Sequence, residues 1–367
     1  MLRIDRRLVA HFEWPLLTLA LAISACGLLT IFSATYAAGA GMSPYVVRQA
    51  AWIAVGLLVL VISLVIDYRV LDRYGLLTYL AVLAMLVLVP LIGVSGGGAR
   101  RWLSLGPVSI QPSEFMKLAL IIVLASQLHR WAAEPRLALR RLVFPTVLIA
   151  IPTYFVLTQP DLGTVIVLLV SAFAVILLAG LPLRLVLLAL LVIGPALPFA
   201  WNHLKPYQRQ RLVSYVNPQS DPLGAGYHAR QSKIAIGSGK VYGKGYLQGT
   251  QNQLRFLPEH HTDFVFSVYA EEWGFIGVAA LLALYSALLL RGATVALRAR
   301  DSFGALLAAG LTGGIILQAT MNLAMTTGLL PVVGITLPFL SYGGSSMLAL
   351  MASLGLIMNV SMRRYTF

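Results

Sequence analysis

Charged residues are scarce in this sequence of 367 residues: Asp, Glu, Lys and Arg together make up 11% of it. A soluble domain carries about 25%. Hydrophobic residues make up 59% of the chain, and the mean hydropathy is +0.83. This composition predicts an integral membrane protein without a soluble domain of any size.

Cysteine is almost absent. Cys26 is the single cysteine, which excludes a disulfide framework within the chain and a metal site built from several cysteines. P-loop, zinc-binding and Gly-x-Ser-x-Gly patterns are also missing from the sequence. Their absence argues against a nucleotide-driven pump and against a serine hydrolase.

Acidic residues are few, 13 against 27 basic ones, so the formal net charge is +14. The basic residues lie in short clusters between apolar runs. Because this is the pattern of membrane topology signals, no nucleic-acid partner is expected.

What the sequence has in abundance is long apolar runs. They predict an all-α integral membrane protein, a polytopic bundle of ten transmembrane helices forming a single domain over residues 1–367. The predicted spans are residues 14–36, 46–66, 74–92, 115–131, 143–158, 163–180, 183–201, 264–290, 303–327 and 341–361.

Basic residues near the short loops predict the orientation. Fifteen arginines lie on one side of the predicted spans, and four basic residues lie on the other: Arg48, Arg100, Arg101 and Lys117. By the positive-inside rule, both termini are then cytoplasmic. Residues 202–262 would form a large extracytoplasmic loop between the seventh and eighth helices.

Asp263 lies where the polar end of this loop meets the eighth apolar run. An ionisable group at such a boundary is costly to desolvate, so it is a candidate functional residue. The alternative is an N-cap, in which Thr262 or Asp263 bonds the first free amides of the helix. Glu271 and Glu272, about 12 Å further down that helix, cannot both face one small site, so at least one is expected to be a buried structural partner.

A second polar cluster is expected at the same outer level. Ser113 is predicted to cap the fourth span, and Glu114 and Lys117, three residues apart, share one helix face. Lys117 needs a partner, which could be Glu114, Asp263 or a bound phosphate. Together with Arg101, this cluster is compatible with base catalysis on a pyrophosphate-linked substrate and equally with an interfacial ion-pair network.

Two further segments are unusual. Residues 328–346 contain two prolines and several glycines at membrane depth, so their backbone is expected to be irregular and either buried in protein or lining a cavity. Residues 227–245 are basic, punctuated by glycine and predicted to be partly helical; they include Lys233. This stretch is interpreted as a docking surface for anionic phosphate or lipid headgroups, with an ordinary solvated loop as the alternative.

These stretches together resemble the SEDS family (shape, elongation, division and sporulation) of polytopic cell-wall proteins, along essentially the whole chain. The resembling stretches are residues 98–102, 111–117, 160–164, 257–274 and 322–346. Residues 231–239 and 245–251 are similar to the elongation member of the family rather than to the division member.

The resemblance implies a ten-helix fold and peptidoglycan glycosyltransferase activity in the bacterial inner membrane, with lipid II as donor and the growing glycan chain as acceptor. The family's essential aspartate falls on Asp263, the expected general base, and its polar pair falls on Glu114 and Lys117. The predicted substrate-binding residues are Glu114, Lys117, Arg101, Thr262, Lys233, Ser341 and Ser345.

A divalent cation, Mg²⁺ or Mn²⁺, is also expected, from the resemblance and from pyrophosphate chemistry, although no metal ligand can be assigned from the sequence. The implied protein partner is a class B penicillin-binding protein, a transpeptidase. Two other functions stay open, a lipid II flippase and a non-catalytic scaffold. Polar groups that collect at the outer face favour chemistry there over transport.

Overall fold

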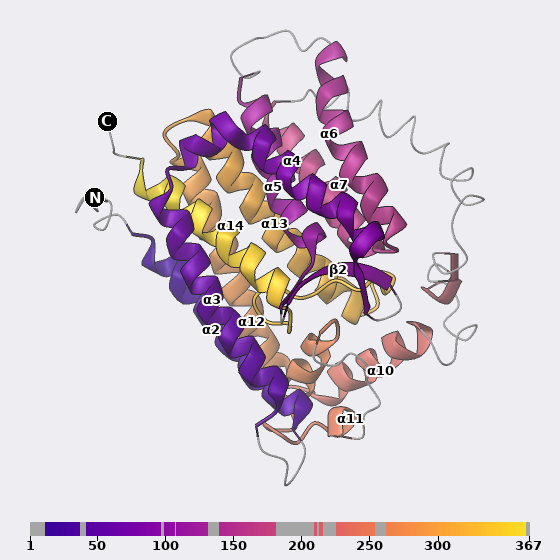
Figure 1. The fold of residues 1–367 in the computed structure, drawn as a ribbon. Coiled ribbons are helices and arrows are strands. Elements are labelled where there is room, and N and C mark those ends of the chain that lie inside the picture. The colour runs from indigo at the N-terminus through magenta and orange to yellow at the C-terminus, as the bar shows by residue number, and fades with distance from the viewer. Residues whose placement is uncertain are drawn as a thin grey trace.

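The computed structural model describes residues 12–36, 42–96, 99–106, 108–130, 139–180, 209–210, 213–215, 225–253 and 262–364 (Figure 1). Within these residues, helices occupy nine of the ten predicted spans: α2 (Trp14–Thr35), α3 (Pro44–Val65), α4 (Tyr68–Ile92), α5 (Pro112–Leu128), α6 (Leu139–Thr158), α7 (Leu162–Leu178), α12 (Val265–Leu297), α13 (Ser302–Thr326) and α14 (Gly344–Met362). The predicted span 183–201 lies outside the described residues. Two further helices, α10 (Ala225–Ser238) and α11 (Thr250–Gln253), belong to the predicted loop 202–262.

Apolar composition and local signals explain these helices. Six of them are long and apolar enough to cross a membrane. Pro44 and Pro112 lie in the first turns of α3 and α5, where a missing N–H costs no hydrogen bond. The Asp161 and Asp301 side chains cap α7 and α13 by accepting a backbone N–H of the first turn.

The prediction of an all-α protein is wrong between α4 and α5. There, β1 (Val94–Gly96), β2 (Ala99–Leu105) and β3 (Val108–Ile110) form an antiparallel sheet in the order β1-β2-β3. Gly106, with a φ of 70°, allows the turn between β2 and β3. The connection is too short and polar to span a bilayer, so its backbone groups pair with one another in hairpins.

The core of the bundle surrounds α14. In its most apolar stretch 94% of the residues are buried, against 17% in α3 and 22% in α4. α3 packs closely on α14, because a Cβ added to Gly355 would lie 2.9 Å from the carbonyl oxygen of Leu60. An exposed apolar helix face needs an apolar surrounding, so α3 and α4 are suited to face lipid and α14 is enclosed by protein.

The bundle has two ends (Figure 1). β2, α10 and α11 lie at one end, called here the strand end. The start of α2 and the end of α14 lie at the other, called here the termini end. α2 runs from the termini end to the strand end, α13 ends at the strand end, and α14 returns from it.

α12 consists of two helical segments separated by Gly274, which has a φ of 62° and a ψ of −163°. The first segment runs toward the strand end, in the same direction as α13. This follows because Asp263 lies beside Asn322, whereas Ser267 is joined through a serine of α10 to Thr326, one turn further along α13.

The second segment of α12 runs back toward the termini end, where Gly292 packs against Thr312 of α13. Glu272, just before the reversal, accepts a hydrogen bond from Ser33 near the strand end of α2. The prediction of one straight eighth span that carries Glu272 deeper into the bundle than Asp263 is therefore wrong.

A loop that follows α10 lies against the break in α12. The N–H groups of Lys244 and Gly245 donate to the carbonyls of Glu271 and Glu272 at 3.0 and 3.1 Å. Two N–H groups beyond the break donate in turn to carbonyls of the loop. The loop thereby satisfies polar groups that the reversal would otherwise leave unpaired.

Candidate functional site

The α13–α14 connection (residues 327–343) is the irregular segment that the sequence predicts, although α14 already begins at Gly344. Its apolar side chains at Val333, Ile335, Leu337, Phe339 and Leu340 are buried, whereas Leu329 and Leu330 at its start are exposed. The Tyr285 hydroxyl donates to one of its carbonyls at 2.5 Å. Its backbone is thus enclosed by protein, as the membrane environment requires of non-helical structure.

Asp263 lies against this connection. Its Oδ2 is 3.4 Å from the position that a Cβ on Gly334 would take. The Asn322 amide donates to the carbonyl of Asp263 at 2.9 Å, and the Ser341 hydroxyl donates to the carbonyl of Thr262 at 2.7 Å. The main chain that carries the Asp263 carboxylate is therefore held from two sides.

The N-cap interpretation of Thr262 and Asp263 is wrong. α12 begins at Val265, its N-cap is Phe264, and no side chain caps it. The Asp263 side chain is only partly buried. Neither Thr262 nor Asp263 therefore occupies the N-cap position of α12.

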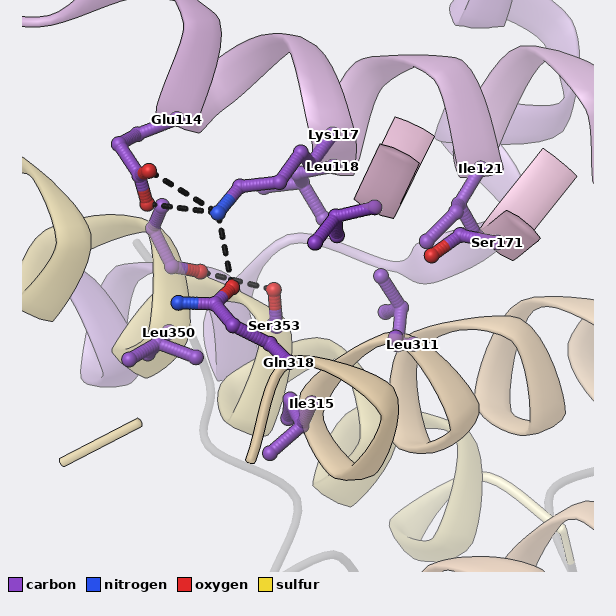
Figure 2. A pocket seen from close by; sticks show the side chains of 13 residues that line it. Glu114, Lys117, Leu118, Ile121, Ser171, Leu311, Ile315, Gln318, Leu350 and Ser353 are labelled. Carbon is purple, nitrogen blue, oxygen red and sulfur yellow. Dashed lines mark hydrogen bonds and ion pairs between the residues drawn. The ribbon is translucent and has the colours of Figure 1, made fainter. Parts of the chain in front are cut away.

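Glu114 and Lys117 form an ion pair, one of the predicted partnerships. The Lys117 ammonium lies 3.0 and 2.9 Å from the two carboxylate oxygens and donates to Gln318 Oε1 at 2.8 Å (Figure 2). The Gln318 amide donates in turn to the carbonyl of Thr336 at 3.1 Å. The pair thus reaches the α13–α14 connection close to Gly334, the residue that Asp263 contacts.

A cavity of about 30 Å³ lies beside this ion pair. Glu114, Lys117 and Gln318 lie at its polar end, and side chains such as Ile121 form its apolar lining (Figure 2). Ser171 Oγ is buried here without a partner among the described residues. The space fits about two water molecules but no sugar or pyrophosphate group. A substrate would therefore bind outside this cavity.

The start of α5 differs from the prediction, because its N-cap is Gln111 rather than Ser113. The Gln111 side chain donates to Ser113 Oγ at 3.1 Å and to Asp161 Oδ2 at 3.3 Å. Its backbone N–H donates to Ser345 Oγ at 2.9 Å. Ser345 is thus buried and hydrogen-bonded at the start of α5.

Arg101 belongs to the same group of contacts. Its guanidinium donates to the carbonyls of Gln159 and Pro160 at 3.0 and 2.5 Å and lies 3.9 Å from Asp161 Oδ2. Gly163, just after this turn, packs against the α13–α14 connection. The structure thus places Arg101 with the α6–α7 turn, whereas Asp263 lies against the connection and Lys117 reaches it through Gln318.

Lys233 lies exposed on α10, and a Cβ on Gly328 would come within 1.9 Å of its Cε. Its side chain therefore crosses the start of the α13–α14 connection. The neighbouring Ser232 is buried and joins α10 to Ser267 and Thr326. The predicted helical character of this basic stretch is confirmed for α10.

Glu271 and Glu272 are both buried structural residues, in agreement with the prediction for at least one of them. Glu271 accepts hydrogen bonds from the Lys244 ammonium at 2.6 Å and from the Gln251 N–H at 3.1 Å. Glu272 accepts one from Ser33. The Glu271 carboxylate thus ties the region after α10 to the reversal of α12, and the Glu272 carboxylate ties the reversal to α2.

Gln318 and Asn322 are not among the site residues predicted from the sequence. They are four residues apart on α13, so they share one face of an apolar helix. Polar side chains at this spacing inside a predicted span were the signal that could have identified them.

The described residues contain no group of three His, Cys, Asp or Glu side chains that could hold a metal ion. Glu114 is already paired with Lys117. The described His, Cys, Asp and Glu side chains thus do not form a metal site by themselves. A divalent cation here would need pyrophosphate oxygens among its ligands.

Comparisons relate this geometry to known proteins. The family model described as a cell cycle protein, for FtsW, RodA and SpoVE, matches residues 13–366. The chain is 42% identical over 355 residues to the peptidoglycan glycosyltransferase MrdB of Escherichia coli K12, covering 96% of this chain and 94% of that one. It is 31% identical over 429 residues to the peptidoglycan glycosyltransferase RodA of Treponema pallidum, covering 97% and 99%.

Solved structures agree. A chain from a peptidoglycan synthase complex, in a structure concerned with the coordination of polymerization and crosslinking, matches with a TM-score of 0.83 at 35% identity, covering 97% of this chain and 99% of that one. The rod shape determining protein RodA of Thermus thermophilus matches with a TM-score of 0.72 at 32% identity, covering 97% and 98%.

Proposed function

We infer the reaction of this chain from its family: it belongs to the FtsW, RodA and SpoVE family of cell cycle proteins, and it is a peptidoglycan glycosyltransferase. We propose that its donor substrate is lipid II and that Asp263 is its general base. The observation that carries this assignment is the position of Asp263, whose main chain is held from two sides and whose carboxylate lies against the α13–α14 connection.

In the proposed reaction, a hydroxyl of the growing glycan attacks the anomeric carbon of the lipid-linked disaccharide. Asp263 takes the hydroxyl proton as the new carbon–oxygen bond forms. The bond between the anomeric carbon and the pyrophosphate oxygen breaks, and its electron pair leaves with undecaprenyl pyrophosphate. Gly334 has no side chain beside the carboxylate, which leaves room for the acceptor.

Lys117 is the cation that we propose for the pyrophosphate. Its ammonium is held by Glu114, which neutralises it, and by the neutral amide of Gln318. A pyrophosphate oxygen that replaces the Gln318 oxygen would gain a charge-assisted hydrogen bond. Arg101 would support this region through the α6–α7 turn, and Lys233 is the exposed cation for the donor's phosphates or for lipid headgroups.

A divalent cation, Mg²⁺ or Mn²⁺, remains part of the proposal as an ion that enters with the substrate. It would neutralise charge on the pyrophosphate. No step above depends on it.

We propose that the strand end faces outward from a bacterial inner membrane and that both termini are cytoplasmic. The distribution of arginines supports this orientation. A tenth span is supported by connectivity, because α7 ends at the termini end and α10 lies at the strand end (Figure 1).

The partner that we propose is a class B penicillin-binding protein. One structural relative is a chain of a peptidoglycan synthase complex, which supports a partner of this kind. The strand end would be the side on which a transpeptidase receives the new glycan.

The test of this function uses purified protein, with the partner, and lipid II in detergent. Asp263→Asn is nearly isosteric but cannot take a proton, so we expect a folded variant whose polymerisation falls by about 10²–10⁴. Asp67→Asn is the matched control, because Asp67 caps α4 and pairs with Arg363 near the termini end. It should keep near-normal polymerisation.

Near-normal polymerisation by Asp263→Asn would contradict the assigned base. Detergent removes the two sides of a membrane and leaves a flippase nothing to transport. Failure of the unaltered chain and its partner to polymerise lipid II would therefore favour the transport function.

A further inference from the structure

Asn322 is fully buried on α13, with none of its surface exposed. Its Nδ2 donates to the carbonyl of Asp263 at 2.9 Å and to the carbonyl of Ile335 at 2.5 Å. Carbonyl oxygens only accept hydrogen bonds, so the NH₂ group must face them. This orientation leaves Oδ1 buried without a partner among the described residues.

The two carbonyls belong to segments far apart in the sequence. One belongs to Asp263 itself, and the other belongs to Ile335, which follows Gly334 in the α13–α14 connection. The Asn322 amide group therefore holds the main chain of Asp263 at a fixed distance from the α13–α14 connection, against which the Asp263 carboxylate lies. The buried Oδ1 has no partner among the described residues. The two hydrogen bonds that Nδ2 donates are therefore the interactions that offset the burial of a polar side chain at this position.

We propose that Asn322 is a positioning residue for the glycosyltransferase reaction: it fixes the main chain of Asp263 so that the carboxylate meets the acceptor hydroxyl. The inference rests on the proposed role of Asp263 as the base. Ser341 holds the preceding carbonyl of Thr262 independently. Loss of Asn322 should therefore shift the carboxylate rather than release it.

A small shift of a catalytic group lowers the rate of the chemical step more than it weakens substrate binding. A displacement of about 1 Å can cost about 10²-fold. For Asn322→Leu, which removes both donors at similar volume, we expect kcat to fall by roughly 10- to 100-fold while KM for lipid II changes by less than about threefold.

Asn359→Leu is the matched control. Asn359 is equally buried, and its Nδ2 donates to the carbonyls of Ser63, Leu64 and Ile66 near the termini end. Like Asn322→Leu, the Asn359→Leu variant loses hydrogen bonds from a buried amide to backbone carbonyls, but it loses them far from Asp263. The Asn359 Oδ1 also accepts hydrogen bonds from the Arg363 side chain at 2.8 Å and from the Tyr68 N–H at 3.4 Å. We therefore expect a larger drop in melting temperature than for Asn322→Leu, but a kcat, per folded molecule, within about threefold of the unaltered chain.

The experiment measures initial rates over a range of lipid II concentrations in detergent, with partner present, for both leucine variants and Asp263→Asn. Each rate is divided by the folded fraction from size-exclusion chromatography. If Asn322→Leu does not fold, Asn322→Ser, which keeps one donor on a shorter side chain, takes its place.

Equal kcat for the Asn322 and Asn359 variants would overturn the positioning role, and so would a change in KM alone. Near-normal polymerisation by Asp263→Asn would instead remove the base on which the inference rests. The two failures are thus distinguishable in the same assay.

Discussion

Lys117 and Glu114 depend on each other because both are nearly buried, with side-chain exposures of 13% and 10%. Removing one member of such a pair leaves an uncompensated charge in the bundle, which typically costs about 3–5 kcal/mol. A single substitution therefore mixes loss of stability with loss of function. Removing both charges separates the two effects.

We predict that Lys117→Met lowers the melting temperature and abolishes most polymerisation. Adding Glu114→Gln to it should recover most of the stability, because no buried charge is left unpaired. Polymerisation should stay at least about 10²-fold down in the double variant if the ammonium serves the pyrophosphate. Thermal melts and lipid II polymerisation in detergent measure both properties. Restored polymerisation in the double variant would show that the pair is only structural.

Among the secondary-structure elements, α12 departs most from a regular helix. Its reversal is stabilised by backbone hydrogen bonds from the loop after α10 and by the ion pair of the partly exposed Lys244 with the buried Glu271. Because Asp263 lies two residues before the start of the first segment of α12, the reversal also sets how that residue enters the site. The loop and the candidate base are thus parts of one structural unit.

We predict that Gly274→Ala is strongly destabilising. Its φ of 62° disfavours any side chain, and the added Cβ would lie 2.2 Å from the amide nitrogen of Gly243 and 2.7 Å from the carbonyl oxygen of Val241. We expect a loss of roughly 2–4 kcal/mol, seen as a lower melting temperature and yield.

Gly313→Ala is the matched control for that substitution. Gly313 lies within α13, and an added Cβ meets nothing within 4 Å. Alanine favours a helix over glycine by about 1 kcal/mol, so this variant should be as stable as the unaltered chain or more so. Similar melting temperatures for the two alanine variants would refute the close packing at the reversal.

For the complete chain, orientation in the membrane is the property that decides where the reaction takes place. We predict that a reporter fused after Phe367 is cytoplasmic and that a tag inserted near Gln219 is extracytoplasmic. The arginine asymmetry is the reason. Labelling with a membrane-impermeant reagent in intact cells measures it. A C-terminus labelled from outside would reverse the orientation and place Asp263 on the cytoplasmic side.

The sequence alone determined the membrane class and nine helices seen in the described residues, and it placed Glu114 and Lys117 on one helix face, with Glu114 as one of three possible partners of Lys117. These features are local. In lipid, a spanning helix satisfies its backbone groups within itself, so an apolar run of sufficient length specifies its own structure. Side chains three residues apart on a helix are neighbours regardless of what surrounds the helix.

Only the tertiary structure decided the reversal of α12 and the setting of Asp263. The reversal needs hydrogen bonds from Lys244, 27 residues before Glu271. Asp263 is held by Asn322, 59 residues away, and the preceding carbonyl is held by Ser341, 79 residues from Thr262. Such contacts form only once distant segments have packed together, so no periodicity or local propensity in the sequence could reveal them.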